Sequence, residues 1–498
     1  MKSLAKTLGE LKKSKYEIIP VKEEMRRNLI QMVKNGDPLF PGIIGYDKTV
    51  IPALRNAILS RHDFILLGLR GQAKSRILRQ LIHFLDEYIP AIEGCPIHDN
   101  PYSPFCKACR IKLENMGPDT PIVWIHRDQR YQEKLATPDV TISDLIGDID
   151  PIKAASHKLS YSDEEVIHFG IIPRSNRGIF AINELPDLPP RIQVGLLNIM
   201  EEKDIQVRGF PIRIPLDICM VYSANPEDYT NRGNIITPLK DRIDSQIMTH
   251  YPEHLKDAIN ITSQEAWIER NNNQTMYMPL WYREIIEMVA FAARKSEYVD
   301  QKSGVSARAT INLLENVVSN MEYRSFLTGD KILIPRLCDL LTALTAVTGK
   351  IELVYEGEQE GVVLVARKII GQAIKNIFKN YYPSPSGKKA REGISEPEPD
   401  SPYQPILDWF SAGGILDLND QLNNEEYFKT LDQVTGLRQL AQEKTNTTTL
   451  EELALSMEFI LEGLHQFSML SKRDTDSTTS YQDMLKAMLD QIPNESGD

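Results

Sequence analysis

Short, almost unbroken apolar runs alternate with amphipathic and loop segments between residues 40 and 255. Apolar runs of strand length that are bounded by turn-forming residues are typical of strands covered on both faces. We expect such strands at 63–69, 121–127, 178–184, 217–225 and 245–251. The alternation predicts an α/β fold with a five-stranded, mainly parallel sheet.

The apolar periodicity becomes helical after residue 255 and stays so, with few turn signals, up to residue 382. We therefore predict an all-helical second domain, then a linker rich in Pro, Ser and charge, then an acidic helical C-terminal region. The expected segments are 1–36 (helical lead-in), 37–255 (α/β domain), 256–382 (helical domain), 383–404 (linker) and 405–498 (acidic region).

The net charge of −12 is concentrated near the C-terminus. Residues 384–498 hold 9 Lys and Arg against 21 Asp and Glu, whereas residues 1–383 hold 48 of each sign. This neutral larger part lacks the basic footprint of a nucleic-acid-binding protein. No apolar run approaches the roughly 18 residues of a membrane helix, and the N-terminus has no continuous apolar signal segment. We expect a cytoplasmic protein without membrane insertion.

The segment Gly68–Arg76, GLRGQAKSR, follows the first predicted strand. It fits the phosphate-loop pattern G-x-x-x-x-G-K-[ST], except that Ala73 replaces the second glycine. In such a loop backbone N–H groups face phosphate oxygens, Lys74 supplies positive charge and the Ser75 hydroxyl binds magnesium. Alanine tolerates ordinary helical dihedrals at this position, and Gly71 gives the turn extra freedom. A simple turn between a strand and a helix is the alternative.

The third predicted strand ends in a polar pair, Asn183 and Glu184, where nucleotide hydrolases carry two carboxylates. At the C-terminal end of an α/β sheet, Glu184 can orient and deprotonate an attacking water. Asn183 brings no negative charge, but its carbonyl can accept a hydrogen bond from a magnesium-bound water. The pair fits an ATPase with a modified metal site, a nucleotide sensor that no longer hydrolyses, or an unrelated buried strand.

Three further polar residues follow in the order expected of a nucleotide site. Asn225 ends the fourth predicted strand and can hold the attacking water from the other side. Arg242 would face a neighbouring subunit's γ-phosphate, with a surface salt bridge to Asp241 or Asp244 as the alternative. Arg308 starts a helix of the second domain and would couple that domain to phosphate occupancy, unless it is simply a solvated helix residue.

Three of the five cysteines are crowded into an insert at 93–112. The spacing Cys95-x2-His98-x7-Cys106-x2-Cys109 offers two knuckles that can place four ligands around one ion, which predicts a structural Zn²⁺. Three free thiols on a loop, or a site in which an outside ligand replaces His98, stay open. The crowding favours a metal site in a reducing compartment over a disulfide framework.

Several segments together resemble the AAA+ ATPases and, within them, the MoxR and magnesium-chelatase I-subunit branch, which has an insert in its second helix. They are FPGIIGYDKTVIPALRNAIL, GLRGQAKS, DLIGDIDP, FGIIPRSNRGIFAINELPDLPPRIQVGLLNIMEEKDIQVRG, YSANPEDY, PLKDRID and SGVSARA. An A-K-S ending of the phosphate loop is common in that branch. The resemblance covers residues 40–320 and does not reach the cysteine insert or the acidic region.

Members of that branch form hexameric rings, bind ATP and Mg²⁺ between subunits, and remodel a partner protein, often one with a von Willebrand A-type domain. The resemblance implies a helical lid, a hairpin at 144–170 and another at 199–216 whose strands flank Gly209. The implied catalytic residues are Glu184 as base, Asn225 as sensor 1, Arg242 as finger and Arg308 as sensor 2. The implied nucleotide-binding positions are Gly45 and Tyr46, near the adenine, with Gly68, Gly71, Gln72, Ala73, Lys74, Ser75, Arg76 and Asn183.

The sequence therefore leads to a Mg-ATP-dependent, ring-forming motor that acts on a partner protein. A low-turnover nucleotide-binding scaffold or switch is the first alternative, because Asn183 removes a charge from the metal site. A nucleic-acid-remodelling ATPase is the second, and the neutral larger part of the chain counts against it.

Overall fold

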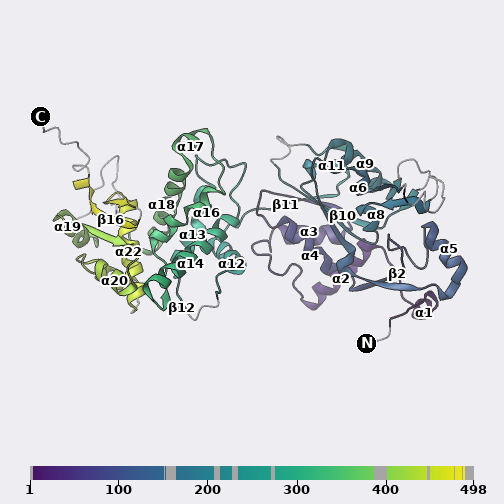
Figure 1. Ribbon diagram of the computed structural model, residues 1–498, viewed down its shortest axis with the longest axis horizontal. Helices are drawn as coiled ribbons and strands as arrows, with labels where there is room; N and C mark the ends of the chain where they lie inside the picture. Colours follow the sequence, from purple (N-terminus) through teal and green to yellow (C-terminus); the bar gives the residue numbers. More distant parts are fainter. Residues whose placement is uncertain are drawn as a thin grey trace. The chain divides into compact units, whose positions relative to one another are not determined.

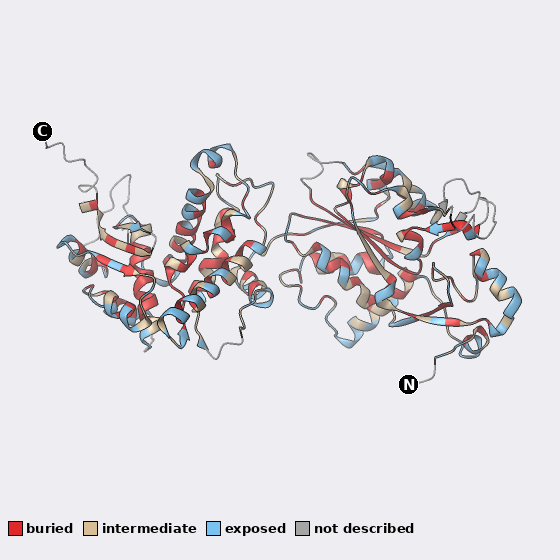
Figure 2. Ribbon diagram, in the orientation of Figure 1, coloured by how far each residue is buried: buried red, intermediate tan, exposed pale blue. Residues whose placement is uncertain are grey.

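The computed structural model describes residues 4–150, 152, 164–206, 213–226, 234–270, 275–385, 401–445, 449–475, 477–484 and 486–487. The chain divides into two compact units, Met1–Tyr251 and Pro252–Asp498 (Figure 1). In both units buried residues lie inside and exposed residues outside (Figure 2). Each unit therefore has hydrophobic packing of its own.

The first unit is built on a five-stranded sheet. Its strands are β1 (Phe64–Leu67), β4 (Tyr131–Leu135), β7 (Gly178–Asn183), β10 (Ile218–Ala224) and β11 (Ser245–Met248). They lie in the order β11-β1-β10-β7-β4, and every neighbouring pair is parallel. All five carboxyl ends therefore lie at one edge of the sheet. The predicted α/β fold with a five-stranded, mainly parallel sheet is confirmed.

Both faces of this sheet are covered, which explains the continuous apolar runs. Phe64 and Leu66 of β1 pack into one hydrophobic cluster, and the alternate residues Ile65 and Leu67 pack into another on the opposite face. The helices that contribute to the first cluster are α2 (Val21–Asn35), α3 (Val50–Leu59) and α4 (Lys74–Gln80), which continues into the 3-10 turn η1 (Leu81–Phe84). The helices that contribute to the second include α8 (Ile171–Arg174), α9 (Pro190–Glu201) and α11 (Thr237–Arg242).

The predicted strand 121–127 lies outside the central sheet. It forms β3 (Ile122–His126), which pairs antiparallel with β2 (Tyr88–Ile92). Its expected place is taken by β4, whose sequence is Tyr-Gln-Glu-Lys-Leu and whose residues are mostly half-buried. An edge strand with a partly exposed surface needs no continuous apolar run, so the apolar pattern did not reveal β4.

Two antiparallel hairpins belong to the first unit. β5 (Gly147–Ile149) pairs with β6 (Ile167–Phe169), and β8 (Asp204–Gln206) pairs with β9 (Arg213–Pro215). They lie where the resemblance implied hairpins, although Gly209 falls outside the described residues. The remaining elements are α1 (Leu8–Lys13), α5 (Lys107–Met116), α6 (Ile142–Leu145), η2 (Gly117–Asp119), η3 (Arg127–Arg130), η4 (Glu164–Val166) and η5 (Leu185–Asp187).

The second unit is mainly helical. Its helices are α12 (Leu255–Glu265), α13 (Leu280–Ala293), α14 (Arg308–Thr328), α15 (Leu337–Thr342), α16 (Leu344–Thr348), α17 (Tyr355–Glu360), α18 (Val362–Tyr381), α19 (Gln404–Ser411), α20 (Asn424–Leu431), α21 (Leu437–Thr445) and α22 (Leu450–Gln466). None of the helices in the described part of the chain combines the length and apolar character needed to cross a membrane.

The second unit also contains strands that the sequence did not predict. β12 (Thr275–Met276) pairs with β13 (Ile332–Leu333), and an antiparallel sheet has the order β14-β16-β15, formed by Leu416–Asn419, Thr478–Asp483 and Leu470–Asp474. The central strand β16 is polar, Thr-Thr-Ser-Tyr-Gln-Asp, and only Thr479 and Tyr481 are buried. A strand with so few apolar positions gives little signal in the sequence.

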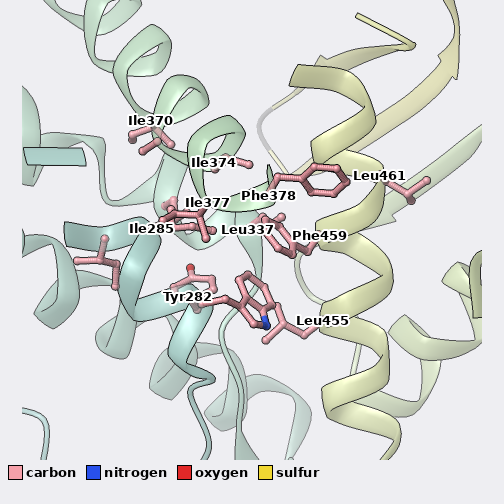
Figure 3. Packing of buried hydrophobic residues seen from close by; sticks show 14 of the residues in the cluster. Tyr282, Ile285, Leu337, Ile370, Ile374, Ile377, Phe378, Leu455, Phe459 and Leu461 are labelled. Atoms are coloured by element: carbon pink, nitrogen blue, oxygen red, sulfur yellow. The ribbon is translucent and has the colours of Figure 1, made fainter. Parts of the chain in front are cut away.

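One hydrophobic core joins the helices on both sides of residues 386–400. Figure 3 shows side chains of α13, α18 and α22 meeting in this core, among them Phe378 and Phe459. Trp281 stacks on Phe459, with ring centroids 4.1 Å apart and planes within 6°. The helical domain and the acidic region therefore share their interior packing.

Candidate nucleotide-binding site

The carboxyl edge of the sheet gathers polar residues predicted from the sequence. Directly after β1, Gly68 donates its N–H to the carbonyl of Ala224 at 3.1 Å, and β10 continues into Asn225. On the other side of β10, the N–H of Glu184 donates to Ser223 Oγ at 3.3 Å. The phosphate loop, Asn225 and Glu184 thus leave the sheet from three adjacent strands.

The loop between β1 and α4 contains two left-handed residues. Gly71 has φ 73°, and Ala73 has φ 57° and ψ 14°. Ala73 therefore does not use the helical dihedrals that alanine tolerates, because it caps α4 in a left-handed region that costs a side chain roughly 1–2 kcal/mol. Left-handed loop residues of this kind build the anion-binding concavities of backbone N–H groups.

Lys74 is the first residue of α4 and is only 7% exposed. Its ammonium group donates to the carbonyl of Gly68 and to that of Leu69, the latter at 3.0 Å. The positive charge is therefore held within the loop rather than in solvent. Ser75 and Arg76, in the same turn of the helix, are exposed.

Residues that follow β11 hold the loop against the sheet. Thr249 Oγ1 donates to Gln72 Oε1 at 2.7 Å, and both side chains are buried. A Cβ on Gly68 would lie 1.8 Å from Thr249 Oγ1, so packing alone requires the first glycine of the motif. Thr249 was not predicted, because only the register of β11 beside β1 brings it to the loop.

The segment implied to lie near the adenine contacts the same loop. Gly45 has φ 81°, and the Tyr46 hydroxyl is directed to the carbonyls of Gln72 at 3.1 Å and His250 at 2.7 Å. Burial raises the pKa of Tyr46 to about 12. Tyr46 therefore stays a neutral hydrogen-bond donor that ties its segment, the loop and the end of β11 together.

The polar pair at the end of β7 is joined to β10 by a hydroxyl that was not predicted from the sequence. Ser223 Oγ donates to Asn183 Oδ1 at 3.1 Å and accepts from Glu184 N–H. Asn183 is buried, whereas Glu184 is half-buried and left-handed, with φ 55°. Such strained non-glycine residues are concentrated at functional sites. The signal for Ser223 was a hydroxyl two residues before Asn225 in an otherwise apolar strand.

The two arginines have different settings. Arg242 ends α11 and pairs with Glu201 of α9, its Nη2 lying 2.6 Å from Glu201 Oε2. The predicted alternative partners, Asp241 and Asp244, are therefore replaced by a residue of another helix. Arg308 is exposed at the first position of α14, in the second unit. It is not among the residues that the first unit brings together.

The cysteine insert forms a compact cluster. One ligand atom from each of Cys95, Asp99, Cys106 and Cys109 lies within 4.8 Å of the others. His98, expected as the fourth member, is not part of this group. Its backbone is left-handed, with φ 50°, and the chain then places the side chain of Asp99 beside the sulfurs. Hydrogen bonds from the other two thiols lower the pKa of Cys95.

No protein-family model and no curated protein matches this chain. A putative ATPase from Cytophaga hutchinsonii is similar at 18% identity and a TM-score of 0.30, covering 74% of this chain and 98% of that chain. A complex between subunits BchI and BchD of magnesium chelatase is similar at 19% identity and a TM-score of 0.34, and the match covers 65% of this chain and 98% of that chain. NtrX from Brucella abortus in complex with ATP is similar at 13% identity and a TM-score of 0.37, and the match covers 71% of this chain and 66% of that chain. Likeness of this degree carries no argument about function, which has to come from this chain's own residues.

Proposed function

We propose that this chain is a Mg²⁺-dependent ATPase of the AAA+ type, in the MoxR and magnesium-chelatase I-subunit branch. The supporting observation is that the loop carrying Lys74 meets Glu184 and Asn225 at the carboxyl edge of three adjacent parallel strands. Ligands of open α/β sheets bind at this edge. Every loop that follows a parallel strand shares this edge, so the support lies in the residue types gathered there: a lysine, a carboxylate and an amide.

The residues of the loop fit a triphosphate. The carbonyls of Gly68 and Leu69 accept from Lys74 Nζ in this structure, and phosphate oxygens would replace them as charged, stronger acceptors. The exposed Ser75 hydroxyl would hold Mg²⁺, which neutralises charge on the β- and γ-phosphates. Asn183 adds an amide where a second carboxylate is usual, so we expect weak magnesium retention.

Hydrolysis would then depend on the residues at the ends of β7 and β10. Glu184 orients a water for attack on the γ-phosphate and accepts its proton, and Asn225 holds the same water from the neighbouring strand. The left-handed backbone of Glu184, fixed through Ser223, supports this role because it sets the direction of the carboxylate. We propose no contribution of Lys74 beyond binding and charge stabilisation.

We further propose that the chain forms a ring, taken as hexameric from the resemblance, and that Arg242 completes the site of the next subunit. Arg242 is partly exposed and is oriented by the Glu201 carboxylate, which supports an outward role. An arginine supplied in trans is worth about 10³-fold or more in rate. The ring would act on a partner protein, such as one with a von Willebrand A-type domain, with Arg308 sensing the nucleotide from the helical lid.

The low-turnover scaffold stays the second candidate because Asn183 is neutral and its carbonyl already accepts a hydrogen bond from Ser223. Steady-state phosphate release separates the two. If the chain is an ATPase, it should release phosphate, and both Lys74→Ala and Glu184→Gln should abolish this release. Glu184→Gln should still bind ATP. A scaffold predicts ATP binding without release, and Asn183→Asp would then raise magnesium affinity and turnover together.

Mixing two inactive variants tests the shared site directly. Arg242→Ala should lose hydrolysis by about 10³-fold or more, and Glu184→Gln by about 10²-fold or more. In mixed rings, a subunit with intact Glu184 can receive an intact Arg242 from its neighbour, so part of the activity should return. Glu201→Gln is the control that alters the surroundings of Arg242 without removing it. No recovery on mixing, despite assembly of both variants, would contradict the finger in trans.

A further inference from the structure

We propose that the insert binds one zinc ion through the thiolates of Cys95, Cys106 and Cys109 and the carboxylate of Asp99. Their ligand atoms already lie within 4.8 Å of one another. Cys106 and Cys109 are buried, and Asp99 has no exposed surface. Zinc takes sulfur and carboxylate ligands in tetrahedral geometry, and four protein ligands leave no open position, as in structural sites.

The separation of the sulfurs fits a single ion. Cys95 Sγ and Cys106 Sγ are 3.9 Å apart. Two sulfurs at about 2.3 Å from one tetrahedral zinc would be about 3.8 Å apart. A disulfide bond would bring them to about 2.05 Å. Cysteines around an iron–sulfur cube bind different iron atoms and lie further apart. The distance therefore favours one mononuclear site.

Backbone contacts prepare the thiolates and the carboxylate for this role. The N–H of Cys109 donates to Cys106 Sγ at 3.4 Å, which stabilises a thiolate. Asp99 Oδ2 accepts from the N–H groups of Phe105 and Cys106, at 2.9 and 3.0 Å. These two bonds close the loop 99–106 and bring Cys106 back beside the first part of the insert. An ionised carboxylate has about four acceptor positions, so Asp99 can make these bonds and bind the ion as well.

His98 is the competing fourth ligand. Its Nδ1 is buried and, among the described residues, has no hydrogen-bond partner, which leaves that nitrogen available as a metal ligand. The geometry nevertheless places the Asp99 carboxylate, and not this imidazole, within the group of ligand atoms.

The ion would fix the insert against two distant segments. Tyr102 Oη donates to the carbonyl of Tyr16 at 2.8 Å, in the N-terminal segment. Asn176 Nδ2 donates to the carbonyl of Ile97 at 3.0 Å, two residues before β7. Zinc would therefore stabilise the entry to the strand that carries Asn183 and Glu184 without touching the nucleotide.

The test measures zinc by mass spectrometry in the full-length chain, purified without chelators or a histidine tag. We expect one zinc per chain in the wild type and in His98→Ala, and loss of zinc in Cys106→Ser and Asp99→Asn. Cobalt exchanged into the wild type and into His98→Ala should give the intense visible absorption of a tetrahedral, thiolate-bound ion. This readout is independent of ATPase activity.

Hydrogen exchange on the wild type covers the case in which a variant misfolds. Removing zinc with a chelator should speed exchange in 95–109 and 171–178 and leave the second unit unchanged. Absence of zinc, with three free or disulfide-bonded cysteines found by alkylation, would overturn the site. Zinc lost in His98→Ala but kept in Asp99→Asn would overturn the assignment of the fourth ligand.

Discussion

The carboxyl edge of the sheet and the interior of the second unit both bury polar side chains, but with different partners. At the sheet edge, Tyr46 and Thr249 bond the atoms of Gln72 in the phosphate loop, and Ser223 bonds the backbone of Glu184. In the second unit, charged side chains from different helices face one another, as Arg324 and Asp339 do. Polar groups at the edge set loop conformation, whereas those in the second unit hold helices together.

The network around α22 illustrates the second arrangement. Glu462 pairs with Lys472 at 2.9 Å and accepts from Tyr481 Oη at 2.8 Å. Burial alone would raise the pKa of Glu462, but the charge of Lys472 and the hydrogen bonds from Lys472 and Gln466 act together with other nearby charge to lower that pKa to about 2. Charges that are compensated in this way are typical of a structural core. The left-handed backbone of Ala73 and Glu184 at the sheet edge is typical of a binding site.

The largest expected effect on stability is that of Arg324→Met. Arg324 makes two hydrogen bonds of 2.8 Å to Asp339, and both residues are buried. Removing the cation leaves a buried carboxylate without its counter-ion, which costs about 3–5 kcal/mol. Hydrogen exchange read by mass spectrometry should show the loss in α13, α14 and α18 and none in β1 or β7.

Tyr46→Phe is the matched change at the sheet edge. It removes a neutral hydrogen bond to loop carbonyls and should cost about 1 kcal/mol, in the first unit only. Replacing both partners of the ion pair, by Arg324→Met with Asp339→Leu, should recover part of the loss. If Arg324→Met costs no more than Tyr46→Phe, the contrast between the two regions is wrong.

The next effect concerns the pH dependence of the second unit. Burial raises the pKa of Glu287 to about 7, from 4.5. Between these values the folded unit keeps a proton that the unfolded chain has released, so stability falls as pH rises through this window. Between pH 5.5 and 8 this group should lower the free energy of unfolding by about 2 kcal/mol.

Urea unfolding at the two pH values measures this slope. In a Trp124→Phe background the remaining tryptophans, 267, 281 and 409, all lie in the second unit and report its unfolding alone. Glu287→Gln should remove its share of the slope. Glu458, whose pKa burial also raises to about 7, should supply the rest. An unchanged slope in Glu287→Gln would mean that its carboxyl is solvated.

The sequence predicted the strands whose two faces are buried and the motifs that end them. β1, β7 and β10 are almost unbroken apolar runs, and polar residues that follow parallel strands must lie at one edge. Lys74, Glu184 and Asn225 could therefore be placed together. β4 and β16 were missed because an edge strand and a polar strand carry no such run.

Residues whose role depends on register or loop closure could not be found in the same way. Ser223 and Thr249 matter because parallel pairing sets them beside Asn183 and the phosphate loop. Asp99 was not predicted as a ligand, because the C-x-x-H spacing indicates His98. In the fold, backbone N–H groups donate to the Asp99 carboxylate and so close the insert around it. Such contacts join residues far apart in the chain or depend on main-chain groups that have no sequence signature.

The smallest expected effect is at Ala73. Its left-handed backbone costs an alanine roughly 1–2 kcal/mol, which Ala73→Gly would relieve. Glycine also gives the unfolded chain about 0.5–1 kcal/mol of extra freedom, so the net gain in stability should lie between about 0 and 1.5 kcal/mol. Affinity for a fluorescent ATP analogue should change by less than about threefold, because the loop conformation stays the same.

Ala73→Val is the control, because a β-branched side chain is far less tolerant of positive φ. It should lose nucleotide binding and speed hydrogen exchange at the start of α4, while the second unit keeps its exchange rates. If valine binds as well as glycine, the loop does not need a left-handed residue at 73. Backbone strain at the sheet edge would then not distinguish it from the charge-compensated interior of the second unit.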